Sequence, residues 1–193
     1  MIKLNILLKD VLDISAGYPF RKKVEPVHKG VPVIQLKDVD LREGLNVKDL
    51  TLTELPYRAP SEWVENEDIL FIAKGSQTFA VLVKGLEEQA VCTPHFFHLK
   101  VKSTQVLPAY IVWLLNQAPM QQYFDQVSEG KYSKLIKKSS LQNISLKLPA
   151  LSIQEQIVSL SEDMQTQTKA LEDIHKQRIN KLTNLNEQAM GEE

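Results

Sequence analysis

His95 and His98 are the first residues whose type and spacing could do chemistry, because imidazole is a common ligand of transition metals. They lie three residues apart in AVCTPHFFHLKV (90–101), a stretch rich in β-branched and aromatic residues that is predicted to be a strand. Side chains three apart on a strand point to opposite faces, so the two imidazoles do not converge. Each is interpreted as a structural or surface histidine, and no metal site is expected.

Other catalytic patterns also fail. A metal-dependent nuclease reading of Asp68 needs a second carboxylate two residues before Lys74, and Ile72 stands there. Phosphate-binding loops of the GxxxxGK[ST] or GxGxxG type are absent, as are the NPP[YF] tetrapeptide and the Gly-rich cofactor motif of an adenine methyltransferase. The single Cys92 is interpreted as a small core residue. The sequence therefore predicts no catalytic residue and no cofactor.

The charge of the chain is unevenly distributed. The net charge is −1, which alone does not indicate a nucleic-acid partner. Residues 1–150 carry a small excess of Lys and Arg, whereas residues 151–193 carry twice as many acidic as basic residues. Within the first part, residues 128–147 hold five lysines against Glu129 alone. Such a local basic patch can neutralise a few phosphates, so the composition permits DNA binding without requiring it.

The cellular setting is inferred from two features. One cysteine cannot form an internal disulfide, which indicates a reducing compartment. The N-terminal MIKLNILLKD offers too short an apolar run for a signal peptide or a membrane span. A cytoplasmic protein without a membrane partner is expected.

Residues 1–150 are predicted to form one domain of the α+β (mixed α/β) class. VPVIQLKDVD (31–40) alternates as a strand does, and DILFIAKG (68–75) and FAVLVKG (79–85) are typical of two strands paired around a Gly-Ser-Gln turn. Helices are predicted to begin at Pro108 and Pro119, because proline is tolerated in a first helical turn. A short strand is expected to close the domain near residue 150.

Residues 151–193 are predicted to form one long coiled-coil helix. Neither Gly nor Pro occurs between Pro149 and Gly191, and Ser152 and Glu155 have the spacing of a capping box. The stripe is narrow, and Gln167 and Arg178 interrupt it, which indicates a seam for a partner helix. At 1.5 Å per residue the helix would span roughly 57 Å and would not be stable alone in water. Packing back on its own domain, or fraying, is the alternative. The candidate dimerisation residues are Ile157, Leu160, Met164, Leu171, Ile174, Leu182 and Leu185.

Taken in order, these pieces resemble the specificity (S) subunit of a type I restriction-modification system. The family usually has Gly-Asp-Ile-Leu where Glu67 precedes Asp68 here, and often has Arg-Gly where this chain has Lys74-Gly75. The most specific pattern is a strand, Leu-Pro, and a glutamine opening a helix, carried here by Leu148, Pro149, Leu151, Glu155, Gln156 and Ile157. The matching stretches are ILLKDVLDISAGYPF, VPVIQLKDVD, ENEDILFIAKGS, LPAYIVWLLNQ and SEGKYSKLIKKSSLQNISLKLPALSIQEQIVSL.

The resemblance implies one target-recognition domain followed by one spacer helix. A full S subunit has two of each, with antiparallel helices, so this chain resembles a half-subunit. Such a subunit is non-catalytic and reads double-stranded DNA, while methylation subunits modify adenine and a restriction subunit, where present, cleaves. Two half-subunits, identical or different, would pair through the helix to read a site with two separated halves. An identical pair requires inverted half-sites.

DNA contacts are expected from basic loops, which hold phosphates, and from amide or guanidinium groups, which read bases. Gln77 and Arg58 are the candidate base readers, and Tyr18 is a further candidate for sugar or phosphate. The rival hypothesis is a coiled-coil docking or regulatory protein that never touches DNA, which the pI near 6.4 favours. A steep loss of DNA affinity with salt would distinguish the two. The candidate DNA-binding residues are Arg21, Lys22, Lys23, Arg58, Lys74, Gln77, Lys131, Tyr132, Lys134, Lys137 and Lys138.

Overall fold

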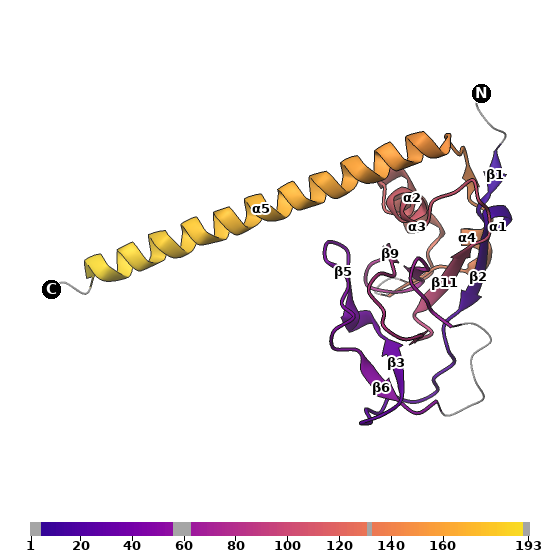
Figure 1. Ribbon diagram of the computed structural model, residues 1–193, viewed down its shortest axis with the longest axis horizontal. Coiled ribbons are helices and arrows are strands. Elements are labelled where there is room, and N and C mark those ends of the chain that lie inside the picture. The colour runs from indigo at the N-terminus through magenta and orange to yellow at the C-terminus, as the bar shows by residue number, and fades with distance from the viewer. Residues whose placement is uncertain (1–4, 56–62, 131–132, 191–193) are drawn as a thin grey trace. The chain divides into compact units, whose positions relative to one another are not determined.

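The computed structural model describes residues 5–55, 63–130 and 133–190. The chain divides into two units, Met1–Glu155 and Gln156–Glu193. The first is a mixed α+β domain, and the second consists of most of one long helix, α5 (Leu151–Met190). The expected fold class, an α+β domain followed by a long helix, is confirmed (Figure 1).

A four-stranded antiparallel sheet forms the centre of the N-terminal unit. Phe97 lies opposite Ala16, and Phe96 lies opposite Ile72, so β11 pairs with a strand on each side. The predicted pairing of segments 68–75 and 79–85 is confirmed, because β7 and β9 are antiparallel neighbours. In spatial order the strands are β2 (Leu12–Ala16), β11 (Phe96–Val101), β7 (Ile69–Ile72) and β9 (Ala80–Leu82).

Both faces of this sheet are covered, which explains the continuous apolar run of β7. On one face the ring of Phe71 packs against Phe124, with the ring centroids 4.9 Å apart. On the other face Leu70 and Ile72 join a buried cluster that includes Ile34. Strands buried on both sides carry apolar residues at every position, as β7 does.

Helices line the first face and close the edge of the sheet. Asn116 follows α2 directly, and its side-chain amide accepts from the Ala80 N–H and donates to the Ala80 carbonyl, both at 2.8 Å. The amide thus takes the place of a further strand beside β9 and satisfies its edge. The helices of this unit are α1 (Leu8–Val11), α2 (Pro108–Leu115), α3 (Ala118–Val127) and α4 (Lys138–Gln142).

Two predicted strands are interrupted. Residues 31–40 form a strand over Val31–Ile34 and another over Val39–Asp40. Between them, the Asp38 carboxylate accepts the Gln35 N–H at 2.8 Å and closes a short 3-10 turn over Leu36–Asp38. Residues 90–101 split at Thr93–His95, since Pro94 lacks the N–H that a ladder needs. The second sheet has the order β10 (Val91–Cys92), β3 (Val31–Ile34) and β6 (Thr51–Thr53).

Short strand pairs complete the unit. Ile6 pairs with Leu146, and the Leu8 N–H donates to the Ile144 carbonyl at 2.9 Å. The described start of the chain is therefore held beside the segment that leads into α5. The remaining strands are β1 (Ile6–Leu7), β4 (Val39–Asp40), β5 (Gly44–Leu45), β8 (Lys74–Gly75), β12 (Lys134–Leu135) and β13 (Ser145–Leu146).

Helix α5 begins one residue earlier than the sequence pattern suggests. The N–H groups of Ile153 and Gln154 donate to the Ala150 carbonyl at 2.9 and 3.1 Å. Ser152 therefore lies inside the first turn and is not the N-cap, so the predicted capping box is wrong. Within the described residues, no helix is both long and apolar enough to cross a membrane.

Glu67 occupies a backbone conformation that favours glycine, with φ of 70°. We expect Glu67→Gly to raise the free energy of unfolding by about 0.5–1 kcal/mol, because a left-handed non-Gly residue costs about 1–2 kcal/mol and the extra chain entropy of glycine offsets part of the gain. Urea unfolding measures the change, with Glu67→Ala as a control that keeps the strain. A lower stability for the glycine variant would show that the Glu67 side chain contributes more than the strain costs.

Candidate functional site

One end of the four-stranded sheet collects the connections that carry candidate DNA-binding residues. Strands β2 and β7 end there, whereas β11 and β9 begin there, because neighbouring strands are antiparallel. Figure 1 shows β2 and β11 side by side in this sheet. The connection from β7 to β9 contains Lys74 and Gln77, and the segment after β2 leads to residues 21–23.

The pairing of β8 with β12 joins two candidate segments that are far apart in the sequence. Lys134 lies opposite Gly75, and Leu135 lies opposite Lys74. The Ile136 N–H donates to the Ala73 carbonyl at 2.8 Å and extends the same contact. We call residues 74–77 and 133–138 the β8–β12 surface. It brings together Lys74, Gln77, Lys134, Lys137 and Lys138.

Acidic side chains partly neutralise this surface. The Lys134 ammonium contacts the carboxylate of Asp125, and the Lys137 Nζ lies 2.6 Å from the Glu129 Oε1. Both carboxylates are more than half exposed, and exposed ion pairs contribute only about 0–1 kcal/mol. A phosphate can therefore compete for these lysines. Lys74 and Gln77 are exposed on the connection itself.

The segment Arg21–Lys23 is exposed, and the residues on either side of it are anchored in a second apolar cluster. Phe20 and Val24 pack against buried Tyr18 and Val33. The Tyr18 side chain is 6% exposed, and its ring centroid lies 4.8 Å from that of Phe20. The suggestion that Tyr18 contacts sugar or phosphate is therefore wrong, because its ring belongs to the core. Arg58, Lys131 and Tyr132 lie outside the described residues.

His98 has the structural role that its position suggested. Its Nε2 lies 2.7 Å from the Asp68 carboxylate, and both residues are buried. The same carboxylate accepts the Glu65 N–H at 2.8 Å and lies 3.8 Å from the Lys100 Nζ. His95 precedes β11 and does not lie on it. Among the described residues, no three His, Cys, Asp or Glu side chains are grouped as a metal site.

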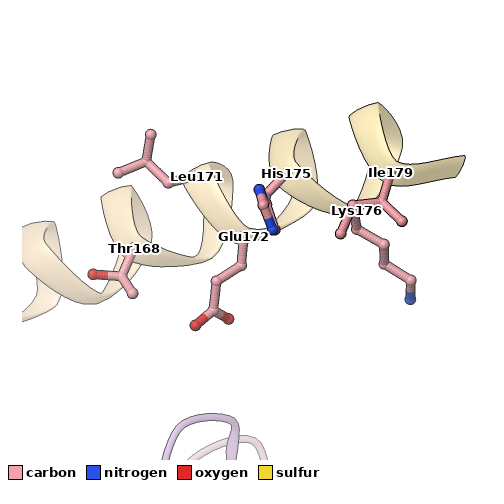
Figure 2. Close-up of a pocket in the computed structure, with 6 residues that line it drawn as sticks. All are labelled: Thr168, Leu171, Glu172, His175, Lys176 and Ile179. Carbon is pink, nitrogen blue, oxygen red and sulfur yellow. The ribbon is translucent and has the colours of Figure 1, made fainter. Parts of the chain in front are cut away.

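The stripe of α5 lies open over most of its length. Leu160, Leu171 and Leu182 are 63, 67 and 68% exposed. Ile153, Ile179 and Met190 are further exposed apolar residues that the stripe did not include. Figure 2 shows a hollow on this helix that is lined by Thr168, Leu171, Glu172, His175, Lys176 and Ile179. Because these side chains all belong to one helix, the hollow is a groove between turns and not an enclosed site.

Gln154 is the site residue that the sequence pattern missed. Its side chain is fully buried, and its Oε1 accepts the Leu107 N–H at 3.0 Å. Its Nε2 donates to the carbonyls of Gln105 and Pro149 at 2.9 and 3.0 Å. The motif glutamine had been assigned to Gln156, which is exposed. Gln154 lies in the first turn after Pro149, and this position lets its side chain reach the loop that precedes α2, whereas Gln156 is exposed.

The family model described as "Type I restriction modification DNA specificity domain" matches residues 5–184. The comparison with curated proteins found no match.

Solved structures share the fold at low sequence identity. The HsdS subunit from Thermoanaerobacter tengcongensis is 18% identical, with a TM-score of 0.61 over 89% of this chain and 39% of its own. A chain reported under complex assembly and conformational transition of the type I R-M system is also 18% identical, with a TM-score of 0.67 over 94% and 43%. The type I S subunit from M. genitalium is 12% identical, with a TM-score of 0.54 over 82% and 38%. The chain thus spans about two-fifths of the length of these structures.

Proposed function

The chain belongs to the family of type I restriction modification DNA specificity domains, and from this membership we propose that it reads one half of a divided DNA site. The observation that carries the proposal is the extent of the match. It covers the α+β unit and most of α5 together, so one recognition domain and one helix are both accounted for. The solved relatives are more than twice as long, so this chain matches about two-fifths of each of them.

The half-subunit that reads the other half of the site would bind through α5. Its exposed apolar stripe needs a partner helix, because a helix with such a surface gains most of its stability by burying it. We propose that Ile157, Leu160, Met164, Leu171, Ile174, Leu182 and Leu185 bind a second half-subunit. The paired chains would then bind methylation subunits and, where present, a restriction subunit. Those partners would supply catalysis.

The β8–β12 surface would contact DNA. Its lysines would hold phosphates, which fix the position of the protein without reading sequence. The Gln77 amide, exposed in the β7–β9 connection, has the donor and acceptor pair that reads adenine in the major groove. Arg21, Lys22 and Lys23, together with Arg58, Lys131 and Tyr132, remain candidates from the sequence.

The test is a map of methylated adenines in cells that express this chain with its cognate methylation subunit. A palindromic site with two separated halves and constant spacing is expected for a pair of identical chains. Two unrelated halves would mean that another specificity chain supplies the second domain. If the complex assembles but methylates no specific sequence, the recognition proposal fails and a docking protein takes its place.

Lys74→Ala and Gln77→Ala are expected to act differently on DNA binding by the assembled complex. Loss of the Lys74 charge should weaken binding to all sequences alike and lower the salt slope of log K by about one per chain. Loss of the Gln77 amide should reduce discrimination at one base pair by about 1–3 kcal/mol and leave the slope unchanged. Titrations at several salt concentrations measure both effects.

The control for both variants is Lys48→Ala, which removes an exposed lysine outside the β8–β12 surface. A salt slope that falls as much for this control as for Lys74→Ala would show that the surface makes no special contact. If the Gln77→Ala variant discriminates among single-base variants of the site as strongly as the unchanged chain does, Gln77 does not read a base.

A further inference from the structure

Gln35 carries a side-chain amide that its neighbours already hold in place. Its Nε2 donates to the Thr51 Oγ1 at 3.0 Å, and the Lys37 Nζ donates to the same oxygen at 3.1 Å. Gln35 directly follows β3 and Thr51 begins β6, so these bonds join the ends of two paired strands (Figure 1). Gln35 and Thr51 are half-buried and Lys37 is exposed, so all three side chains reach the surface of the domain.

These hydrogen bonds leave donors and acceptors for a ligand. A threonine hydroxyl accepts two hydrogen bonds and donates one, so Thr51 keeps its O–H after both contacts. The Gln35 amide uses one N–H and keeps its Oε1 and a second N–H. Within the described residues, neither of these two side chains makes another hydrogen bond. Gln35 thus offers an acceptor and a donor from an amide that Thr51 already orients.

Gln35 lies on the same face of the second sheet as Val33. Side chains alternate along an extended chain, and Gln35 is extended, with φ of −119° and ψ of 167°, so it points to the side of Val33. Thr51 pairs with Val33 in the ladder, which places it on this face too. The residues that flank segment 21–23 pack against the cluster that contains Val33. The Gln35 amide and this basic segment therefore belong to one face.

The turn that follows Gln35 packs beside the β8–β12 surface. Leu36 opens this 3-10 turn, and a Cβ placed on Gly75 would lie 3.9 Å from the Leu36 Cδ1. Gly75 in turn pairs with Lys134. Gln35 is therefore joined to both sets of proposed phosphate contacts, segment 21–23 on one side and the β8–β12 surface on the other.

We propose that Gln35 reads an adenine in the DNA half-site, with Thr51 as its positioning residue. An amide oxygen accepts from the N6 amino group of adenine, and an amide N–H donates to N7 in the major groove. A side chain that is ordered before binding loses less freedom on contact than a free one. The proposal rests on the proposed function and adds a base reader to Gln77.

Lys37 brings positive charge to the same place. Its side chain is 60% exposed, and its Nζ lies 3.9 Å from the Asp38 Oδ1. An exposed ion pair at this distance is weak, so a DNA phosphate can compete for the ammonium. Such a contact holds the backbone of any sequence beside the Gln35 amide, and the amide then discriminates between bases.

Binding of the assembled complex to single-base variants of its site tests Gln35. The complex contains this chain and its cognate methylation subunit, and the adenine map gives the site. Gln35→Ala should reduce discrimination at one A·T pair by roughly 5- to 150-fold and leave the other positions and the salt slope of log K unchanged. Lys37→Ala should instead lower the slope by about one per chain and spare discrimination. Gln122→Ala, which removes an exposed amide on α3, is the matched control and should change neither.

The hydroxyl of Thr51 is tested by a pair of variants. Thr51→Val keeps the β-branched shape that suits a strand and removes the acceptor, so discrimination at the same base pair should fall. Thr51→Ser keeps a hydroxyl and should retain the discrimination. An equal loss in both variants would show that the shape of the side chain matters and would overturn the positioning role.

The remaining outcomes separate this proposal from the proposed function. Discrimination by the Gln35→Ala complex that matches the unchanged complex at every position would overturn the proposal, and so would a loss of affinity that is equal for all sequences. A complex of the unchanged chain that binds every sequence alike would overturn the proposed function itself. Only that second failure is seen without any substitution, so the two are distinguishable.

Discussion

We expect the double variant Leu160→Asp, Leu182→Asp to self-associate more weakly, with a dissociation constant raised by roughly a thousandfold or more. Each leucine is exposed in the single chain and would be buried in the pair. Burial of a leucine side chain contributes about 1.5–3 kcal/mol, and four such side chains are lost from one dimer. Because 1.4 kcal/mol changes an equilibrium tenfold, a thousandfold change needs about 4 kcal/mol, which is less than the sum of about 6–12 kcal/mol for the four side chains. Sedimentation equilibrium measures it.

The matched control adds the same two negative charges elsewhere on α5. Gln165→Asp and Asn184→Asp lie on exposed positions about a third of a turn from the stripe. This control is expected to associate within a few fold of the unchanged chain, since only weak surface electrostatics change. Circular dichroism should show that both double variants keep the α+β unit, because none of the four positions belongs to it.

The same variant separates recognition from assembly. If two paired chains read one divided site, the leucine variant should lose sequence-specific methylation in cells while the control keeps it. Methylation that persists although the chain is monomeric would show that one recognition domain acts without its pair. A variant that remains dimeric would instead remove the stripe from the interface.

Local patterns in the sequence were enough to predict the elements whose contacts are local. Pro108 and Pro119 marked the first turns of α2 and α3, and both helices are present. The Gly-Ser-Gln turn indicated that β7 and β9 pair, and they do. The absence of Gly and Pro after Pro149 predicted the long α5. In each of these cases, the residues that decide the structure lie within a few positions of it.

Features that depend on distant partners could not be predicted. The contact between β8 and β12 joins residues some sixty positions apart, and no pattern in either segment indicates which other segment it pairs with. The split of residues 90–101 also has a distant cause. The Tyr18 N–H donates a hydrogen bond to the Cys92 carbonyl at 2.7 Å, at the point where β10 ends. Gly17 allows this approach, since a Cβ there would lie 2.1 Å from the Thr93 carbonyl oxygen. The basic cluster was predicted, but its pairing with Asp125 and Glu129 was not.

The start of α5 shows how a motif can be recognised while its key residue is misassigned. Three glutamine or glutamate side chains follow one another at 154–156, and the pattern alone does not say which one turns inward. Burial decides it, because Gln154 is fully buried, whereas Glu155 and Gln156 are exposed. Its amide joins the first turn of α5 to the loop that precedes α2. It therefore fixes the first turn of α5 within the N-terminal unit.

Gln154→Ala is expected to lower the free energy of unfolding of the N-terminal unit by about 3 kcal/mol. The substitution removes three hydrogen bonds and leaves the Leu107 N–H and the Gln105 and Pro149 carbonyls without this partner. A polar group left unpaired away from water costs about 1–3 kcal/mol, and because these three bonds are only partly buried, water that reaches the groups keeps the sum at the lower end. Urea unfolding followed by tryptophan fluorescence measures the change.

Gln156→Ala is the matched control, with the same atoms removed two residues along the same helix. Because Gln156 is exposed, its loss should change the free energy of unfolding by less than about 0.5 kcal/mol. Hydrogen exchange at the Leu107 amide gives a local readout, since that N–H would lose its acceptor only in the Gln154 variant. Equal stability of the two variants, with Leu107 still protected, would show that the buried amide does not hold the helix root.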